Sequence, residues 1–110
     1  MIVVLTAFRL PKPITSDEAR SIFLSTAPTY RGVKGLLRKH YVISEDGATA
    51  GGVYFWTSRS EADAMYTPSW RSFVKGKYGT EPTVTYFESP ITVDNVAGKI
   101  LSDDGGERNP

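Results

Sequence analysis

The two residues best suited to acid–base chemistry are neighbours in the chain, Lys39 and His40. His40 is the only histidine, and its imidazole would serve near neutral pH as a general base or as an axial haem ligand. Lys39, if it points inward, would hold a partly desolvated ammonium that stabilises a phenolate or enolate. Each also has a structural alternative: a polar strand residue at 40, and at 39 an aliphatic stem that covers apolar surface with its ammonium in water.

A dense set of aromatic residues accompanies this pair. Such a set either fills the core or lines a cavity for a flat apolar ligand, and tyrosine and tryptophan carry polar tips that need partners when buried. We expect a substrate pocket between sheet and helices, with seven candidate lining residues: Tyr41, Tyr54, Trp56, Tyr66, Trp70, Phe73 and Tyr78.

The first elements are marked by a proline stop and a helix cap. An apolar, β-branched run over 2–10 predicts a strand. Thr15 and Glu18 have the spacing of a capping box, so a helix should begin there. The same helix should end near Ala27, because Pro28 disfavours helical backbone in the residue before it.

The rest of the chain reads as a hairpin, a broken helix and a last strand. Strands are predicted over 36–43 and 51–56. A second capping box at Ser58 and Glu61 starts a helix that Thr67 and Pro68 interrupt and restart. Gly79 should end that helix as a left-handed cap, and 83–88 is the last strand.

The resulting order, β-α-β-β-α-β, predicts an α+β fold of the ferredoxin-like type, with a four-stranded antiparallel sheet and helices on one face. We expect one domain over 1–101 and a disordered tail over 102–110, which lacks apolar periodicity.

Two of the predicted strands are apolar on both faces, although helices would cover only one face of the sheet. In the first strand Val3 and Leu5 oppose Val4 and Phe8, and the strand 51–56 shows the same pattern. An uncovered apolar sheet face favours a homodimer packed sheet against sheet.

Composition narrows the function further. The formal net charge of the 110-residue chain is +1, with scattered basic residues, which disfavours nucleic-acid and membrane partners. The chain has no cysteine, which fits a reducing, cytoplasmic setting, and with one histidine a protein metal site is improbable. No hydrolase or phosphate-loop motif is present in the sequence.

Several runs resemble the YdhR-type monooxygenase family. They are Gly35-Leu36-Leu37-Arg38-Lys39-His40-Tyr41, Gly51-Gly52-Val53-Tyr54-Phe55-Trp56, Tyr78-Gly79 and Val93-Asp94-Asn95, and the resemblance spans about 2–100. The resemblance implies a dimeric α/β barrel. It also implies, as a possible activity, the oxygenation of aromatic phenols without metal or flavin that relatives of this family carry out. Haem-degrading relatives make haem, bound through His40, the weakest alternative.

We therefore expect a monooxygenase that needs no cofactor and acts on an aromatic or other small apolar substrate. Lys39 or His40 would favour the substrate anion, and the aromatic set would hold its rings. The alternative is a non-catalytic dimer that binds a small apolar molecule in the same pocket.

The hairpin turn decides which candidate base faces the pocket, since adjacent strand residues point to opposite faces. A two-residue type I′ turn at 46–47 places Lys39 across from Tyr54 and Leu37 across from Trp56. A three-residue loop over 45–47 would shift the register by one and bring Arg38 and His40 to that face instead. We expect the first register.

Overall fold

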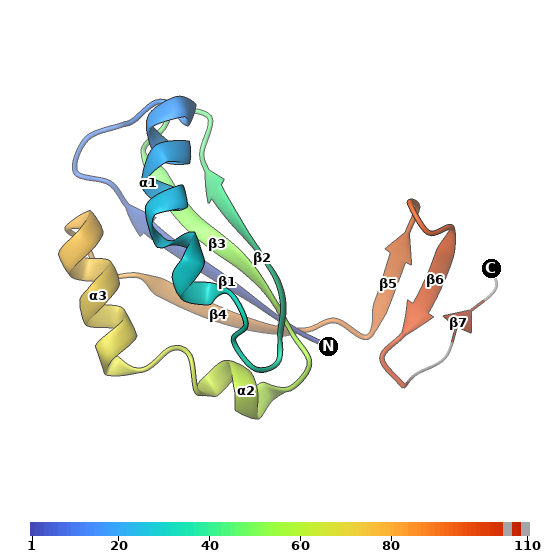
Figure 1. Ribbon diagram of the computed structural model, residues 1–110. Helices are drawn as coiled ribbons and strands as arrows, with labels where there is room; N and C mark the ends of the chain where they lie inside the picture. Colours follow the sequence, from blue (N-terminus) through green and yellow to red (C-terminus); the bar gives the residue numbers. More distant parts are fainter. Residues whose placement is uncertain (105–106, 109–110) are drawn as a thin grey trace.

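The computed structural model describes residues 1–104 and 107–108, and its elements follow the predicted order as far as residue 88 (Figure 1). The helices and strands are β1 (Ile2–Arg9), α1 (Ser16–Tyr30), β2 (Leu36–Ile43), β3 (Thr49–Trp56), α2 (Arg59–Asp63), α3 (Pro68–Tyr78), β4 (Thr83–Glu88), β5 (Ile91–Asp94), β6 (Lys99–Ser102) and β7 (Glu107–Arg108).

The first four strands form one antiparallel sheet in the order β2-β3-β1-β4. All three helices lie on the same side of this sheet (Figure 1). This is the ferredoxin-like arrangement, so the predicted α+β fold is confirmed. Its central strands, β1 and β3, pair along their whole length and place their inward side chains under the helices.

Helix α1 begins as predicted and ends later than predicted. The Thr15 hydroxyl accepts the Glu18 amide at 3.1 Å and the Glu18 carboxylate accepts the Thr15 amide at 3.0 Å, which completes the capping box. The predicted end near Ala27 is wrong, because Pro28 lies inside the last turn and the helix continues to Tyr30. A proline there loses one backbone bond, and burying the Tyr30 side chain offsets that loss.

The broken helix is confirmed as α2 and α3. Ser58 accepts the Glu61 amide at 3.3 Å, but the Glu61 carboxylate accepts from the Thr57 and Ser58 hydroxyls, so only half of the second capping box forms. Thr67 caps α3 with a bond to the Trp70 amide at 3.2 Å. Gly79 ends α3 in the left-handed conformation, with φ of 85°.

The hairpin register is the expected one, although the turn is not. Lys39 pairs with Tyr54, but Asp46 does not have the positive φ that a type I′ turn needs. The Ser44 amide instead donates to the Thr49 carbonyl at 2.8 Å, which leaves four loop residues between them. A four-residue loop between Ser44 and Thr49 pairs the same residues of β2 and β3 as a two-residue turn at 46–47 would. The Asp46 carboxylate stabilises the loop by accepting hydrogen bonds from the Ser44 hydroxyl and the Ala48 amide.

A β-bulge at the start of β2 corrects one part of the predicted register. Leu36, not Leu37, lies across from Trp56, and Arg38 lies across from Phe55. The bulge leaves Leu37 61% exposed, so Leu37 does not join the aromatic face as predicted.

The helices cover one face of the main sheet and leave the other face exposed in the single chain. The inner face is buried beneath the helices and includes Val4, Phe8 and Tyr54. The outer face carries Leu5, Val42 and Phe87, which are 39%, 43% and 49% exposed. The predicted two-sided apolar character of β1 and β3 is therefore present, with one side uncovered in the single chain.

A second, three-stranded sheet, β5-β6-β7, follows β4 and projects away from the main domain (Figure 1). Its base is held by the Asp103 amide, which donates to the Pro90 carbonyl at 2.9 Å. The tail predicted from 102 onward starts within this sheet, since Ser102 ends β6 and 107–108 pair with it. Residues 105–106 and 109–110 lie outside the described residues.

Candidate functional site

Lys39 lies on the inner face of β2, inside a cage of tyrosine rings. Its Nζ is 3.4 Å from the ring centre of Tyr30, 3.7 Å from that of Tyr41 and 4.8 Å from that of Tyr54. The three rings come from the end of α1, from β2 and from β3. Ring faces attract a cation, so this cage receives the ammonium where a carboxylate would be the usual partner.

Burial changes the proton affinity of this ammonium. Desolvation lowers the pKa of Lys39 from 10.5 to about 7. Within the described part of the chain, Lys39 forms no ion pair that would restore the ordinary value. Lys39 can therefore exist as a neutral amine, which accepts a proton, or as an ammonium, which stabilises an anion, near neutral pH.

Gly52 provides the space in which the Lys39 stem lies. A Cβ at position 52 would be 3.1 Å from Lys39 Cε and 2.9 Å from Tyr54 Cε1. Gly52 is buried in the middle of β3, where glycine gives up backbone entropy without a side chain to pack. Its place in the strand is explained by the close approach of these two side chains.

The ammonium borders a small cavity between the sheet and the helices. The cavity has a volume of about 20 Å³, which is roughly the room that one water molecule needs. Five of the seven predicted pocket residues line it: Tyr41, Tyr54, Trp70, Phe73 and Tyr78.

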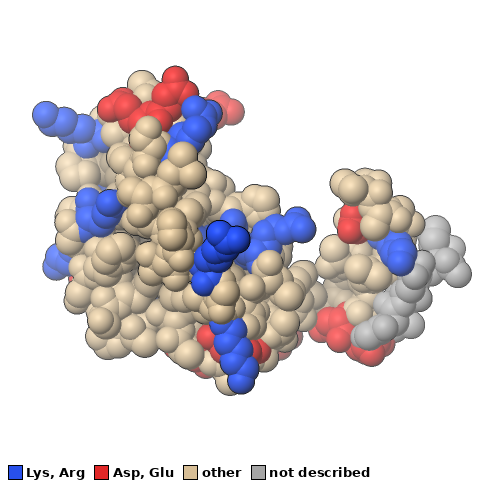
Figure 2. All heavy atoms as spheres, in the orientation of Figure 1, with Lys and Arg blue, Asp and Glu red and all other residues tan. Residues whose placement is uncertain are grey.

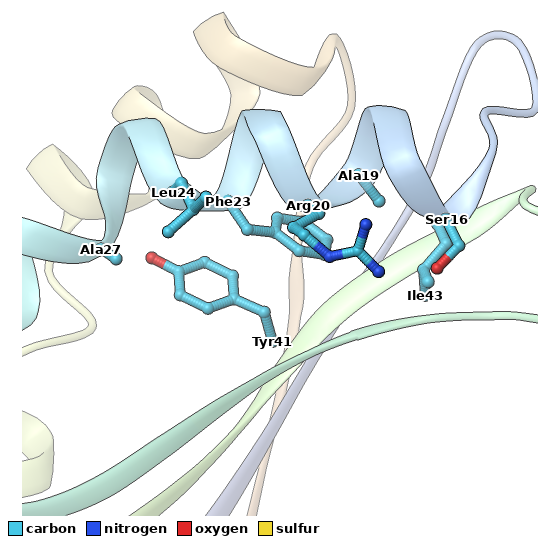
Figure 3. Close-up of a pocket in the computed structure, with 8 residues that line it drawn as sticks. All are labelled: Ser16, Ala19, Arg20, Phe23, Leu24, Ala27, Tyr41 and Ile43. Carbon is cyan, nitrogen blue, oxygen red and sulfur yellow. The ribbon is translucent and has the colours of Figure 1, made fainter.

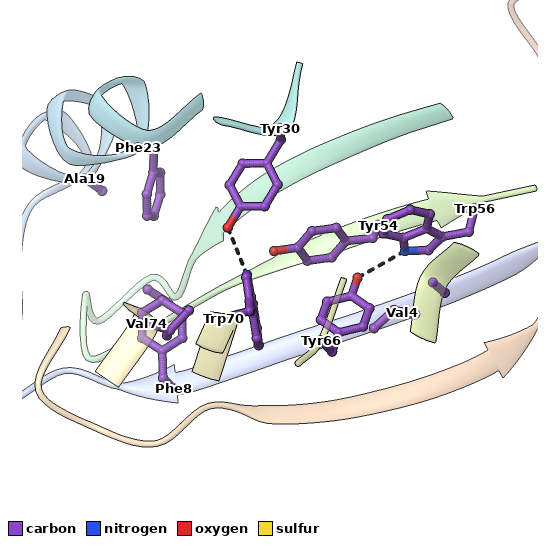
Figure 4. Packing of buried hydrophobic residues seen from close by; sticks show 12 residues of the cluster. Val4, Phe8, Ala19, Phe23, Tyr30, Tyr54, Trp56, Tyr66, Trp70 and Val74 are labelled. Atoms are coloured by element: carbon purple, nitrogen blue, oxygen red, sulfur yellow. Dashed lines mark hydrogen bonds between the residues drawn. The ribbon is translucent and has the colours of Figure 1, made fainter. Parts of the chain in front are cut away.

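The other two, Trp56 and Tyr66, belong to the adjoining core. Trp56 Nε1 donates to the Tyr66 hydroxyl at 3.0 Å, and Trp70 Nε1 donates to the Tyr30 hydroxyl at 3.1 Å (Figure 4). Tyr66 meets Tyr54 and Trp70 edge-on, with ring centres 5.3 Å and 5.0 Å apart. These contacts fix the orientation of the rings that surround Lys39.

Three tyrosine hydroxyls of the site, those of Tyr41, Tyr54 and Tyr78, stay protonated at neutral pH. Burial raises the pKa of Tyr54 and Tyr41 above the usual value, and it raises that of Tyr78 to about 12. The Tyr41 hydroxyl also shares a hydrogen bond of 2.8 Å with Thr26 Oγ1. The site therefore contains neutral hydrogen-bond donors and one titratable cation.

His40 lies on the opposite face of the sheet. It is exposed, pairs across the strand with Val53 and meets the Phe55 ring edge-on at 6.0 Å. The structure thus separates the two candidate bases and places only Lys39 beside the aromatic cavity.

Six lining residues were not among the predicted site residues: Thr6, Phe8, Thr26, Tyr30, Gly51 and Val74. Thr26 and Tyr30 lie on the same helix face as Phe23, at three-to-four spacing. A prediction that continued the helix past Pro28 would have placed Tyr30 on that face. Thr6 is the one polar residue between Val4 and Phe8 on the inner face of β1, and that break in the alternation was its signal.

Two wider hollows adjoin the cage. One, of about 300 Å³, lies between α1 and β2 and is lined by apolar residues with Arg20 (Figure 3). Tyr41 reaches from β2 towards α1 there, with Phe23 and Leu24 near its ring. The other hollow, of about 280 Å³, is lined by Tyr30, Lys39 and Tyr41 together with the loop after α1.

The described residues include no cluster of three or more histidine, cysteine or acidic side chains that could hold a metal ion. No helix among them is long and apolar enough to cross a membrane.

No family model and no curated protein matches the chain. Solved structures do. A Deinococcus radiodurans protein named as an antibiotic biosynthesis monooxygenase superposes with a TM-score of 0.63 at 11% identity, over 86% of this chain and 97% of that one. A Streptomyces coelicolor monooxygenase in complex with nanaomycin D gives 0.61 at 17% identity, over 80% and 86%.

SnoaB from Streptomyces nogalater, a cofactor-independent oxygenase, superposes with a TM-score of 0.60 at 16% identity, over 84% of this chain and 95% of SnoaB. At these identities the likeness establishes a common fold. The resemblance to the YdhR-type family in particular stays a prediction. The chain shares the ferredoxin-like fold of these monooxygenases.

Proposed function

We propose that this protein is a monooxygenase that uses no cofactor and oxidises a flat phenolic substrate beside Lys39. The observation that carries the proposal is the Lys39 Nζ, held 3.4 Å and 3.7 Å from two tyrosine rings with a pKa lowered to about 7. A lysine that loses its proton near pH 7 matches the task of a general base. The shared fold with SnoaB supports the reaction class.

In the proposed reaction the phenol O–H bond breaks and its proton moves to the lone pair of Lys39 Nζ. The new ammonium then stabilises the phenolate in a site with little water. An electron-rich ring carbon of the phenolate bonds to dioxygen, and loss of water from the hydroperoxide leaves a quinone carbonyl. One oxygen atom enters the product and the other leaves as water. The substrate supplies all four electrons, so no external reductant is required.

A substrate ring that enters the cavity itself, and does not stay in the hollow lined by Tyr30, Lys39 and Tyr41, requires the cage to open. A cavity of about 20 Å³ is far smaller than the several hundred Å³ that an aromatic ligand occupies. Phe73 lines the cavity while 45% exposed, so it is the lining residue with the least packing to lose when it moves. Displacing Phe73 would connect the cavity to the hollow beside Trp70 that these two residues also line.

The test is oxygen uptake and quinone absorbance with a panel of hydroxynaphthalenes and hydroxyanthracenes, without added metal or flavin. We expect turnover that rises with pH through about 7 and falls at least a hundredfold in Lys39→Met. Lys39→Arg keeps the charge but has no neutral form, so it should lose the pH dependence as well as the activity. Lys12→Met, at an exposed lysine, is the matched control.

Tight binding of these compounds with no oxygen uptake would refute the oxygenase and favour the non-catalytic binding protein. Turnover that persists in Lys39→Met would refute the role of Lys39.

We further propose that the protein is a homodimer in which the outer sheet faces meet. The outer face exposes apolar side chains from three of the four strands: Leu5 on β1, Val42 on β2 and Phe87 on β4. Phe87→Glu should yield a monomer in light scattering at micromolar concentration. Leu24→Glu, which changes an exposed leucine on α1, should leave the dimer intact. A monomeric wild type, or a dimer lost through Leu24→Glu alone, would overturn this interface.

A further inference from the structure

We infer that the substrate carries an acidic group, and that the groove beside Lys39 binds that group through Arg31 and Arg38. This inference rests on the proposed function and extends it to the class of substrate: an aromatic phenol with a carboxylate. Lys39 lines the small cavity and also the wider hollow of about 280 Å³, called the groove from here on, so the groove gives an aromatic ligand access to Lys39.

The groove joins the cage directly. Tyr30, Lys39 and Tyr41 line both spaces, so the same rings form the inner wall of the groove and the outer wall of the cavity. The groove volume approaches the lower end of the range for small-molecule sites. A two-ring aromatic lying against Tyr30 and Tyr41 would present one end to Lys39 and the other to the rim of the groove.

The rim is basic. Arg31 caps the C-terminal end of α1. Arg38 follows the bulge in the edge strand β2 and lies across from Phe55, so its side chain starts on the outer face of the sheet. Both arginines are exposed residues that line the groove. The groove lining contains no acidic residue. Within the described part of the chain neither arginine forms an ion pair, so both guanidinium groups remain available to a ligand.

The charge distribution on this side of the molecule agrees with that assignment. Basic side chains lie in the middle of the face shown in Figure 2 and also along its upper, left and lower margins, while the acidic side chains of the main domain gather towards its top and bottom. Arginine binds carboxylates through two parallel hydrogen bonds, which orients a ligand as well as attracting it. A carboxylate held at the rim would leave the phenol of the same ligand directed inward, towards the one cation of the cage.

The experiment measures binding by titration calorimetry with three matched probes: 6-hydroxy-2-naphthoate, its methyl ester and 2-naphthol. We expect the acid to bind at least tenfold more tightly than the ester, and the advantage to shrink between about 0.02 M and 0.5 M salt. Arg31→Gln and Arg38→Gln should each remove most of that advantage and leave the ester unchanged. Arg9→Gln, an exposed arginine outside the groove, should leave the advantage intact.

Equal affinity for acid and ester, no binding of the acid, or equal effects of the three arginine variants would overturn the inference. Oxygen uptake separates it from the proposed function. Acid-selective binding without oxygen uptake keeps the ligand class and refutes the oxygenase. Turnover of all three probes with no preference for the acid keeps the oxygenase and refutes the ligand class.

Discussion

The burial of Lys39 should make the stability of the fold rise with pH. In the folded protein Lys39 has a pKa of about 7, whereas in the unfolded chain it has the ordinary value of 10.5. Between these values the unfolded state binds one more proton, so the free energy of unfolding increases as pH rises. Below about pH 7 both states are protonated, and the Lys39 contribution no longer changes with pH.

The size of the effect follows from two opposing contributions. Each pH unit above the folded pKa adds about 1.4 kcal/mol, so the interval from pH 7.5 to 9.5 would add at most about 2.7 kcal/mol. The tyrosine rings attract the ammonium by about 1 kcal/mol, which offsets part of that gain. The net expectation is a gain of about 2 kcal/mol over this interval.

The assay is urea unfolding at pH 7.5, 8.5 and 9.5 for the wild type, Lys39→Met and Lys12→Met. Burial raises the pKa of Tyr54, Tyr66 and Tyr78, so these residues titrate only in the unfolded chain near the top of this range, and that effect is common to all three proteins. Subtracting the pH dependence of the free energy of unfolding of Lys39→Met from that of the wild type therefore isolates the contribution of Lys39. Lys12→Met should retain the wild-type slope. A wild-type slope equal to that of Lys39→Met would refute the buried, desolvated lysine and with it the proposed base.

Two further predictions concern the packing around the cage. Gly52→Ala should push the Lys39 stem away from β3 and raise the pKa of Lys39, which NMR of isotopically methylated lysine would detect. Gly76→Ala, with nothing within 4 Å of its added carbon, should leave that pKa unchanged. An unaltered Lys39 titration in Gly52→Ala would contradict the proposed packing of Lys39 against Gly52. Trp70→Ala should lower the free energy of unfolding, measured with urea, by about 3–5 kcal/mol, because Trp70 is 9% exposed and donates a hydrogen bond to Tyr30. A decrease well below 1 kcal/mol would show that Trp70 lines open space.

The sequence by itself determined the order of the elements as far as residue 88 and the facing of the strands. Caps such as Thr15 and Gly79 are local, because a side chain or a left-handed glycine within a few residues satisfies the end of the helix. Strand facing follows from alternation, so the pairing of Lys39 with Tyr54 could be derived by counting from the hairpin. It was correct although the turn has four residues, because two and four residues leave the same side chains facing.

The tertiary structure decided the features that depend on packing between distant segments. Local preference ends α1 before Pro28, but burial of Tyr30 against β2 and β3 extends it. The bulge at Leu37 has no turn residue to announce it, and it exchanges Leu36 for Leu37 beside Trp56.

The cage around Lys39 belongs to the same class of features. Its ring from Tyr30 comes from outside the hairpin, and the side-chain bond from Trp70 to Tyr30 spans 40 residues of sequence. A lysine next to a histidine is chemically ambiguous in the sequence. Only the assembled sheet and helices desolvate Lys39 and leave His40 exposed, because desolvation is a property of the surrounding packing and not of the residue.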